Sequence, residues 1–184
     1  VAEVIMVERD LRLVETTGAR YHASRLSTAA AIRVMRRAKD KGLNVTCDTA
    51  PHYFALNEGA VTDYRTFAKV SPPLKSEEDR LAVVAGLADG TIDAIVSDHT
   101  PRDPDSKRLT FELAETGTLG LETLLAVTLE LVNNRTLPML DALAPLTCNP
   151  AGILGLPGGT LAKGAPADLV IFDPEVAGIV DADN

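Results

Sequence analysis

Three segments of the chain carry residue types that suit catalysis or metal binding. Together they contain the three histidines of the chain, and two of them also hold an aspartate. The segments are 21–28 (YHASRLST), 48–52 (DTAPH) and 97–101 (SDHTP). Imidazole and carboxylate groups act as general acids and bases and as metal ligands. Residue type therefore points to these segments as the place for a hydrolytic or metal site.

Asp98 is the foremost single candidate. It ends the apolar stretch 91–98 (TIDAIVSD), and a carboxylate there is costly to bury unless it binds a metal, a proton or a positive partner. A helix cap or a loop carboxylate is an equal alternative. The neighbouring His99 points to the opposite face and is expected to be structural, whereas His52 is a ligand, a substrate contact or a loop residue. The chain has no HxH, HExxH, P-loop or GxSxG motif.

The elements that must position these segments alternate between helix and strand. The pattern predicts helices at 1–18, 29–42, 77–90, 119–133 and 137–146, strands at 21–26, 43–50, 91–98 and 167–173, and irregular stretches at 51–75 and 99–110. Such an order is typical of an α/β fold with a parallel sheet. In these folds function gathers at the carboxyl ends of the strands, which is where the three segments lie.

Composition restricts the partners of the protein. The 184 residues carry a formal net charge of -8, which argues against nucleic acid or an anionic membrane as a partner. No apolar run approaches the roughly 20 residues of a membrane span, and charges stand where a signal peptide would be apolar. Cys47 and Cys148 are expected to be reduced, and the protein to be cytoplasmic.

Longer stretches of the chain resemble a known family in unbroken order. These include RRAKDKGLNVTCDTAPHYFALNE, SPPLKSEEDRLAVVAGLADGTIDAIVSDHTP and TCNPAGILGLPGGTLAKGAPADLVIFDP. They look like the C-terminal half of a class I dihydroorotase of the cyclic amidohydrolase superfamily. The resemblance implies a TIM barrel, of which the chain supplies strands 6–8 within residues 1–147, and part of a small β-sandwich domain in 148–184. The rest of the barrel, with most of its metal ligands, is expected to lie outside this chain.

The resemblance also assigns site residues. Asp98 matches the aspartate that serves as general base and zinc ligand, whereas Arg25 stands at the position of a zinc-binding histidine. Side chains alternate between the two faces of a strand, so His22, three residues before Arg25, is expected to face the helices and not the metal position. Two substrate-contact positions also depart from the family, with Ser71 in place of asparagine and Arg102 in place of histidine. Arginine has no lone pair to donate, so we expect Arg25 to form a buried ion pair with Asp98 where the metal would lie.

Two functions follow from the resemblance. The first is a zinc-dependent dihydroorotase that interconverts dihydroorotate and N-carbamoyl-aspartate, with Asp98 taking a proton from a metal-activated water. The second is an inactive homologue that binds no zinc and serves as a structural partner of aspartate transcarbamoylase; the departures at Arg25, Ser71 and Arg102 favour it. An allantoinase or hydantoinase is a further alternative. A homo-oligomer is expected in each case.

Overall fold

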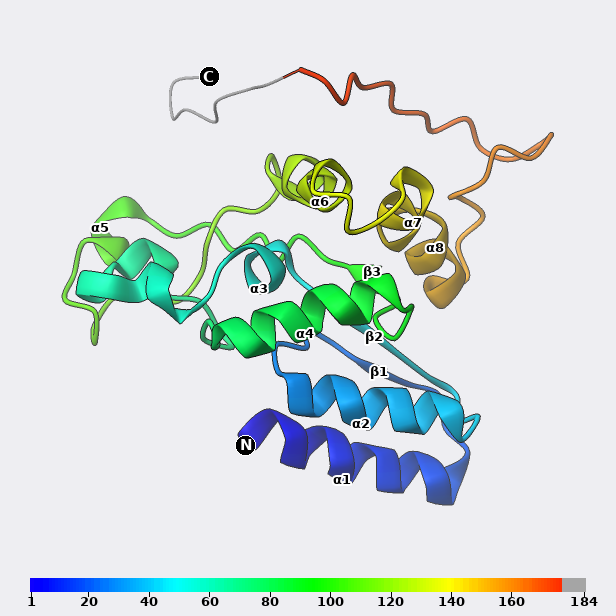
Figure 1. Cartoon of the computed structure of the whole chain (residues 1–184), viewed down its shortest axis with the longest axis horizontal. Coiled ribbons are helices and arrows are strands. Elements are labelled where there is room, and N and C mark those ends of the chain that lie inside the picture. The colour runs from blue at the N-terminus through cyan, green and yellow to red at the C-terminus, as the bar shows by residue number, and fades with distance from the viewer. Residues whose placement is uncertain (177–184) are drawn as a thin grey trace.

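Three short parallel strands lie at the centre of the computed structural model, which describes residues 1–176 (Figure 1). The strands are β1 (Tyr21–Ala23), β2 (Val45–Thr49) and β3 (Ala94–Ile95), and they pair in that order. Tyr21 lies opposite Val45 in the first pair, and Asp48 opposite Ala94 in the second. The parallel α/β sheet predicted from the alternating pattern is confirmed.

Helices connect the strands and continue beyond them. The α-helices are α1 (Ala2–Thr17), α2 (Ala29–Asp40), α3 (Pro51–Ala55), α4 (Glu77–Ala88), α5 (Pro104–Lys107), α6 (Leu124–Asn133), α7 (Met139–Leu143) and α8 (Cys148–Leu154). Three 3-10 helices are η1 (Glu58–Tyr64), η2 (Thr66–Ala68) and η3 (Ala144–Leu146). None of the helices in residues 1–176 is long and apolar enough to cross a membrane.

Local signals in the sequence set the ends of the helices that precede and follow β1. Gly18 takes a left-handed backbone at φ 67° and ends α1. Thr28 accepts a hydrogen bond from the amide of Ala31 and caps α2. The carboxylate of Glu3 in α1 reaches the same place, where it accepts from the amides and hydroxyls of Ser27 and Thr28. The first turn of α1 therefore stabilises the start of α2.

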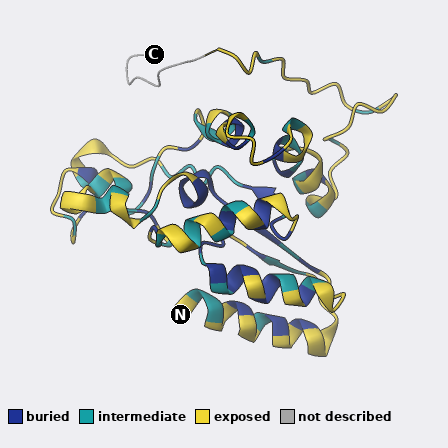
Figure 2. Cartoon of the chain, in the orientation of Figure 1, coloured by how far each residue is buried: buried dark blue, intermediate teal, exposed yellow. Residues whose placement is uncertain are grey.

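The third covering helix is tied to the same region. Ser76 accepts from the amide of Asp79 and caps α4, and the carboxylate of Asp79 accepts from the amide of Ala29 in α2. The core lies between these helices and the sheet, and its fully buried large side chains include Leu26, Ile32, Met35, Val83 and Ile92. Figure 2 shows this burial along the strands and the inner sides of α2 and α4, with the chain after α8 mostly exposed.

The structure corrects four expectations about the elements. The strand expected at 21–26 ends at Ala23, because Arg25 has a left-handed backbone at φ 58° that no strand accommodates. The strand expected at 91–98 is reduced to Ala94–Ile95, and the stretch 51–75 contains short helices. Residues 167–173 form no strand, since no strand of the described part pairs with their backbone. The domain boundary after residue 147 stays a prediction.

Candidate functional site

A small cavity brings together the four residues that the resemblance assigns to metal and substrate positions. Arg25, Ser71, Asp98 and Arg102 all line a space of about 140 Å³. The other lining residues are Val70, Thr100, Thr116, Gly117 and Thr118. Arg25 follows β1 and Asp98 follows β3, so the cavity lies at the carboxyl end of the sheet. Residues far apart in the sequence therefore meet where the sequence predicts a site.

Arg25 and Asp98 form the ion pair expected from the sequence. Nη1 of Arg25 lies 3.2 Å from Oδ1 of Asp98 and donates a second hydrogen bond to the carbonyl of Ser71 at 3.0 Å. The expectation that the pair is buried is wrong on one side, because the Arg25 side chain is 43% exposed and that of Asp98 15%. The guanidinium lies along the wall of an open cavity, where water reaches it. Exposure limits the energy of such a pair to about 1 kcal/mol.

Both residues of the pair have a left-handed backbone. Arg25 has φ 58° and Asp98 has φ 46°. For a residue with a Cβ atom this conformation costs roughly 1–2 kcal/mol, so the surrounding contacts must hold it in place. The site therefore stores backbone strain at the two positions that meet.

Asp48 supplies the contact that holds Arg25. Its Oδ1 accepts a hydrogen bond from the backbone amide of Arg25 at 2.6 Å, and its Oδ2 accepts from the hydroxyl of Ser24 at 3.1 Å. The residue is 4% exposed and is the last but one of β2. The sequence analysis placed Asp48 in a candidate segment but gave it no role, although the argument that singled out Asp98, a carboxylate near the end of a buried strand, applies to it equally.

His22 belongs to this network and not to the helix side of the sheet. Its Nδ1 lies 2.7 Å from Oγ1 of Thr46, and its Nε2 lies 2.8 Å from Oδ2 of Asp48. Its neighbour Ala23 is the one that joins the core against α2. The expected direction of His22 is wrong, because the alternation was counted from Arg25, which lies beyond the end of β1. His22 does not line the cavity.

His52 lies behind the ion pair. It is 8% exposed, and its Nε2 has no hydrogen-bond partner but lies 3.6 Å from Oδ2 of Asp98. Burial lowers the pKa of His52 to about 4, with Asp98 acting against the shift and Arg25 adding to it. The imidazole is therefore neutral at pH 7. The two carboxylate oxygens of Asp98 face Arg25 on one side and His52 on the other.

The remaining predicted residues make structural contacts. Nδ1 of His99 accepts from the amides of Gly120 and Leu121 at 3.2 and 3.3 Å, which agrees with the structural role expected for it. Nε of Arg102 donates to the carbonyl of Thr116 at 2.9 Å, and its Nη1 lies 3.2 Å from a carboxylate oxygen of Glu115. The charge of Arg102 is thus already paired at the edge of the cavity.

The residues present do not fit a zinc ion. Within residues 1–176 no three histidine, cysteine, aspartate or glutamate side chains come close enough together to hold a metal. The position beside Asp98 is filled by the guanidinium of Arg25, which has no lone pair and repels a dication. Zinc in tetrahedral sites takes at least three protein ligands. Arg25 and Asp98 therefore form an ion pair and not a set of metal ligands.

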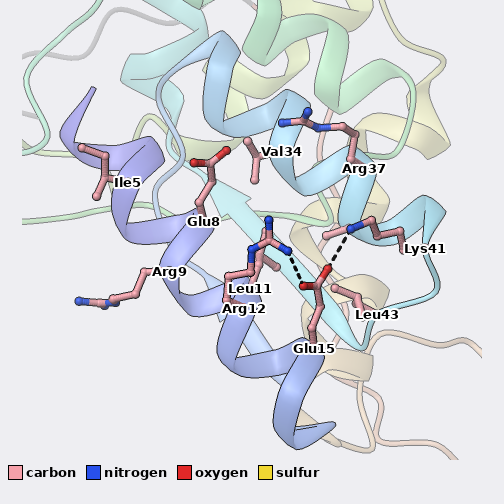
Figure 3. A pocket seen from close by; sticks show the side chains of 11 residues that line it. Ile5, Glu8, Arg9, Leu11, Arg12, Glu15, Val34, Arg37, Lys41 and Leu43 are labelled. Carbon is pink, nitrogen blue, oxygen red and sulfur yellow. Dashed lines mark hydrogen bonds and ion pairs between the residues drawn. The ribbon is translucent and has the colours of Figure 1, made fainter.

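A second groove lies on the helix layer, between α1 and α2. It measures about 520 Å³, and Figure 3 shows Glu15 of α1 between Arg12 and Lys41. The carboxylate lies 2.9 Å from each of these cations, and its hydrogen bonds with Lys41 and Arg12 lower the pKa of Glu15. None of the residues predicted to do chemistry lines this groove.

Comparisons with known proteins agree with this architecture. A family model described as "Amidohydrolase family" matches residues 1–184. A dihydroorotase of Syntrophotalea carbinolica is 50% identical over 98% of this chain and 43% of its own length, and one of Anaplasma phagocytophilum is 48% identical over 98% and 41%. The chain thus spans less than half the length of these relatives.

Solved structures show the same fold. The L-hydantoinase of Arthrobacter aurescens matches with a TM-score of 0.89 and 29% identity, over 96% of this chain and 41% of its own. A D-hydantoinase from Bacillus sp. AR9 matches with a TM-score of 0.89 and 25% identity over the same shares. The three parallel strands and their helices are therefore part of a TIM barrel, as predicted.

Proposed function

The chain belongs to the amidohydrolase family and is of the dihydroorotase type, and from this premise we propose that it serves pyrimidine biosynthesis without zinc catalysis. We propose this function for a complete barrel, to which this chain, spanning 43% of the length of the matched dihydroorotase, contributes strands 6–8. The single observation that carries the proposal is the ion pair at 3.2 Å between Arg25 and Asp98. A carboxylate oxygen that is hydrogen-bonded to an arginine is not free to bind a metal ion or to accept a proton from a reacting water.

The surroundings of Asp98 support the same proposal. Its Oδ1 faces the guanidinium of Arg25, and its Oδ2 faces the buried Nε2 of His52. Arg25 and Asp98 line the same cavity, so an atom that reaches Asp98 from there also lies near the guanidinium. Ser71 contributes its backbone carbonyl to Arg25, where an active relative is expected to offer an asparagine side chain to the substrate. In this proposal the protein is a structural partner of aspartate transcarbamoylase in the cytoplasm, without turnover of its own and assembled as a homo-oligomer.

An active dihydroorotase is the second candidate, and a specific observation favours it. Proteins named dihydroorotase are up to 50% identical to this chain over nearly all its residues, and Asp98 is retained. In that function the full-length protein converts dihydroorotate to N-carbamoyl-aspartate and back. An allantoinase or hydantoinase is less well supported, since the identity to the matched hydantoinases is 29% at most among those described above.

Zinc content and turnover of the full-length protein separate these functions. Purified protein is measured by elemental analysis and assayed for dihydroorotate hydrolysis in the presence of added zinc. The proposal expects less than a tenth of a zinc ion per chain and no hydrolysis above background. Near-stoichiometric zinc together with hydrolysis would overturn the proposal and establish the second candidate.

A matched variant sharpens the test. Arg25→His replaces the guanidinium by the imidazole of the family pattern, while Ser71 and Arg102 remain changed. We expect this variant to take up zinc more readily than the parent but not to reach the turnover of an active dihydroorotase. Full turnover from this one substitution would show that Ser71 and Arg102 do not limit activity.

A further inference from the structure

Two lysine ammonium groups bind backbone carbonyls next to the cavity. Nζ of Lys69 lies within 3.0 Å of the carbonyl oxygens of Phe111, Glu112 and Ala114. Nζ of Lys107 lies 2.8 Å from the carbonyl of Glu115, 2.9 Å from that of Gly117 and 3.4 Å from that of Lys69 itself. Each ammonium therefore directs its three donors at three carbonyl oxygens.

No carboxylate neutralises these two charges in the described part of the chain. Lys107 is 3% exposed, and neither lysine forms an ion pair within residues 1–176. A buried charge is costly unless it is paired or well hydrogen-bonded. Hydrogen bonds from an ammonium are roughly twice as strong as those between neutral groups, so six carbonyls provide the compensation here. An apolar residue at either position would remove three of these hydrogen bonds.

The bound carbonyls belong to the segment that forms one wall of the cavity. Of the residues that line the cavity, Thr116, Gly117 and Thr118 lie in or directly after the bound segment 111–117, and Val70 and Ser71 directly follow Lys69. The amide of Gly117 also donates to the carbonyl of Lys69 at 3.0 Å. Both segments are thus joined at Lys69, two residues before the carbonyl that receives Arg25.

Gly117 shows how closely this wall is packed. Its backbone has φ 139°, and a Cβ atom there would lie 2.5 Å from the carbonyl oxygen of Thr100. The amide of Thr100 in turn donates to the carbonyl of Thr118 at 2.9 Å. The wall is therefore continuous from Lys69 through segment 111–118 to the residues that follow Asp98.

We propose that Lys69 and Lys107 are positioning residues that hold segment 111–118 and thereby shape the cavity around Arg25 and Asp98. The two ammonium groups act through the backbone and touch no ligand. The part of the proposal that concerns ligand affinity rests on the second candidate function, in which the protein binds a substrate, whereas the part that concerns the wall rests on the hydrogen bonds alone.

Hydrogen exchange in the full-length protein tests the wall directly. In Lys107→Ala we expect the amides of residues 99–118 to exchange at least tenfold faster, with those of α2 unchanged. Arg108→Ala is the matched control, because Arg108 is the next residue, carries the same charge, and has a side chain that is 71% exposed. Its exchange should stay within twofold of the parent. Lys69→Ala carries the same expectation as Lys107→Ala and provides the test if the latter does not fold.

Chemical rescue separates the ammonium from the space that it fills. Propylammonium supplies the atoms that Lys107→Ala removes, and 1-propanol supplies a neutral molecule of the same length. We expect propylammonium to slow exchange in 99–118 back toward the parent and 1-propanol to have no effect. Unchanged exchange in both lysine variants, or equal rescue by the alcohol, would overturn the proposal.

Ligand affinity tests whether the two lysines also determine the shape of the cavity. If the parent binds N-carbamoyl-aspartate, we expect Lys107→Ala to weaken binding at least tenfold and propylammonium to restore it. Unchanged affinity alongside faster exchange would overturn the positioning role. A parent without any affinity agrees with the proposed function and contradicts the second candidate, and the exchange measurement then decides the role of the two lysines.

Discussion

Asp48 binds the backbone amide of Arg25, and Asp98 binds the charged side chain of the same residue. The amide of Arg25 lies 2.6 Å from Oδ1 of Asp48, while its guanidinium lies 3.2 Å from Oδ1 of Asp98. Two carboxylates from different strand ends thus bind opposite ends of one residue. The first contact stabilises the left-handed backbone at φ 58°, and the second neutralises the side chain. Asp48 therefore fixes the backbone of residue 25, and Asp98 binds its side chain.

Loss of the Asp48 carboxylate should destabilise the protein strongly. Asp48→Ala removes the acceptor of Arg25, Ser24 and His22 together, and we expect the free energy of unfolding to fall by about 3 kcal/mol. Asp48→Asn keeps one acceptor oxygen and should cost clearly less. Urea denaturation of the full-length protein measures both. Equal losses for the two variants would contradict the backbone role of Asp48.

The ion pair itself should contribute little to stability. Because the Arg25 side chain is 43% exposed, a double-mutant cycle of Arg25→Met and Asp98→Asn should give a coupling of about 1 kcal/mol or less. Denaturation of the parent, both single variants and the double variant supplies the four free energies. A coupling of several kcal/mol would mean that the pair is as buried as the sequence led us to expect.

His52 should make stability depend on pH in the acid range. Its pKa is about 4 in the fold and 6.5 in an ordinary environment. Between these pH values His52 therefore binds a proton in the unfolded chain but not in the folded protein. The free energy of unfolding therefore falls as the pH drops from 6.5 toward 4, by up to about 3 kcal/mol, and is unaffected by His52 above that range.

A variant isolates the His52 contribution from that of other groups. His52→Gln removes the titrating ring, so the difference in stability between parent and variant should change between pH 6.5 and 4 and stay constant from pH 7 to 8. Denaturation at a series of pH values gives this difference. A constant difference over the whole range would show that His52 is protonated equally in both states.

Glu3 should stabilise α2 from a distance in the sequence. Glu3→Ala removes the acceptor of two amides and two hydroxyls at Ser27 and Thr28, and we expect a loss of about 2 kcal/mol. Glu8→Ala is the control on the same helix, since Glu8 is exposed. Thermal unfolding compares them. A loss for Glu3→Ala no larger than for Glu8→Ala would contradict this contact.

Helices were the part of the fold that the sequence predicted well. Gly18 ends α1, Thr28 caps α2 and Ser76 caps α4, each as expected. These signals are local, because a cap and the amide that it binds are three residues apart. The three strands of the sheet were predicted in order but not in length, and the strand expected at 167–173 does not form. Their ends depend on pairing with strands that are distant in the sequence.

Within the site, the sequence pointed to Arg25, Ser71, Asp98 and Arg102, and the structure brings them to one cavity. The sequence analysis gave Asp48 no role, and it assigned His22 to the wrong face of the sheet. Strand alternation holds only as far as the strand extends, and β1 ends two residues before Arg25. No pattern along the chain marks that end, since the hydrogen bond from Arg25 to Asp48 is what produces it.

The sequence by itself determined the family and the α/β order, and it predicted an arginine where the resemblance expects a metal ligand, because each depends on residue types and short spacings. Only the tertiary structure decided what that arginine does. It pairs with Asp98 in an open cavity, beside a wall that two lysines hold through backbone carbonyls. Carbonyls are common to all residues, so contacts to them leave no trace in the sequence and exist only once the chain has folded.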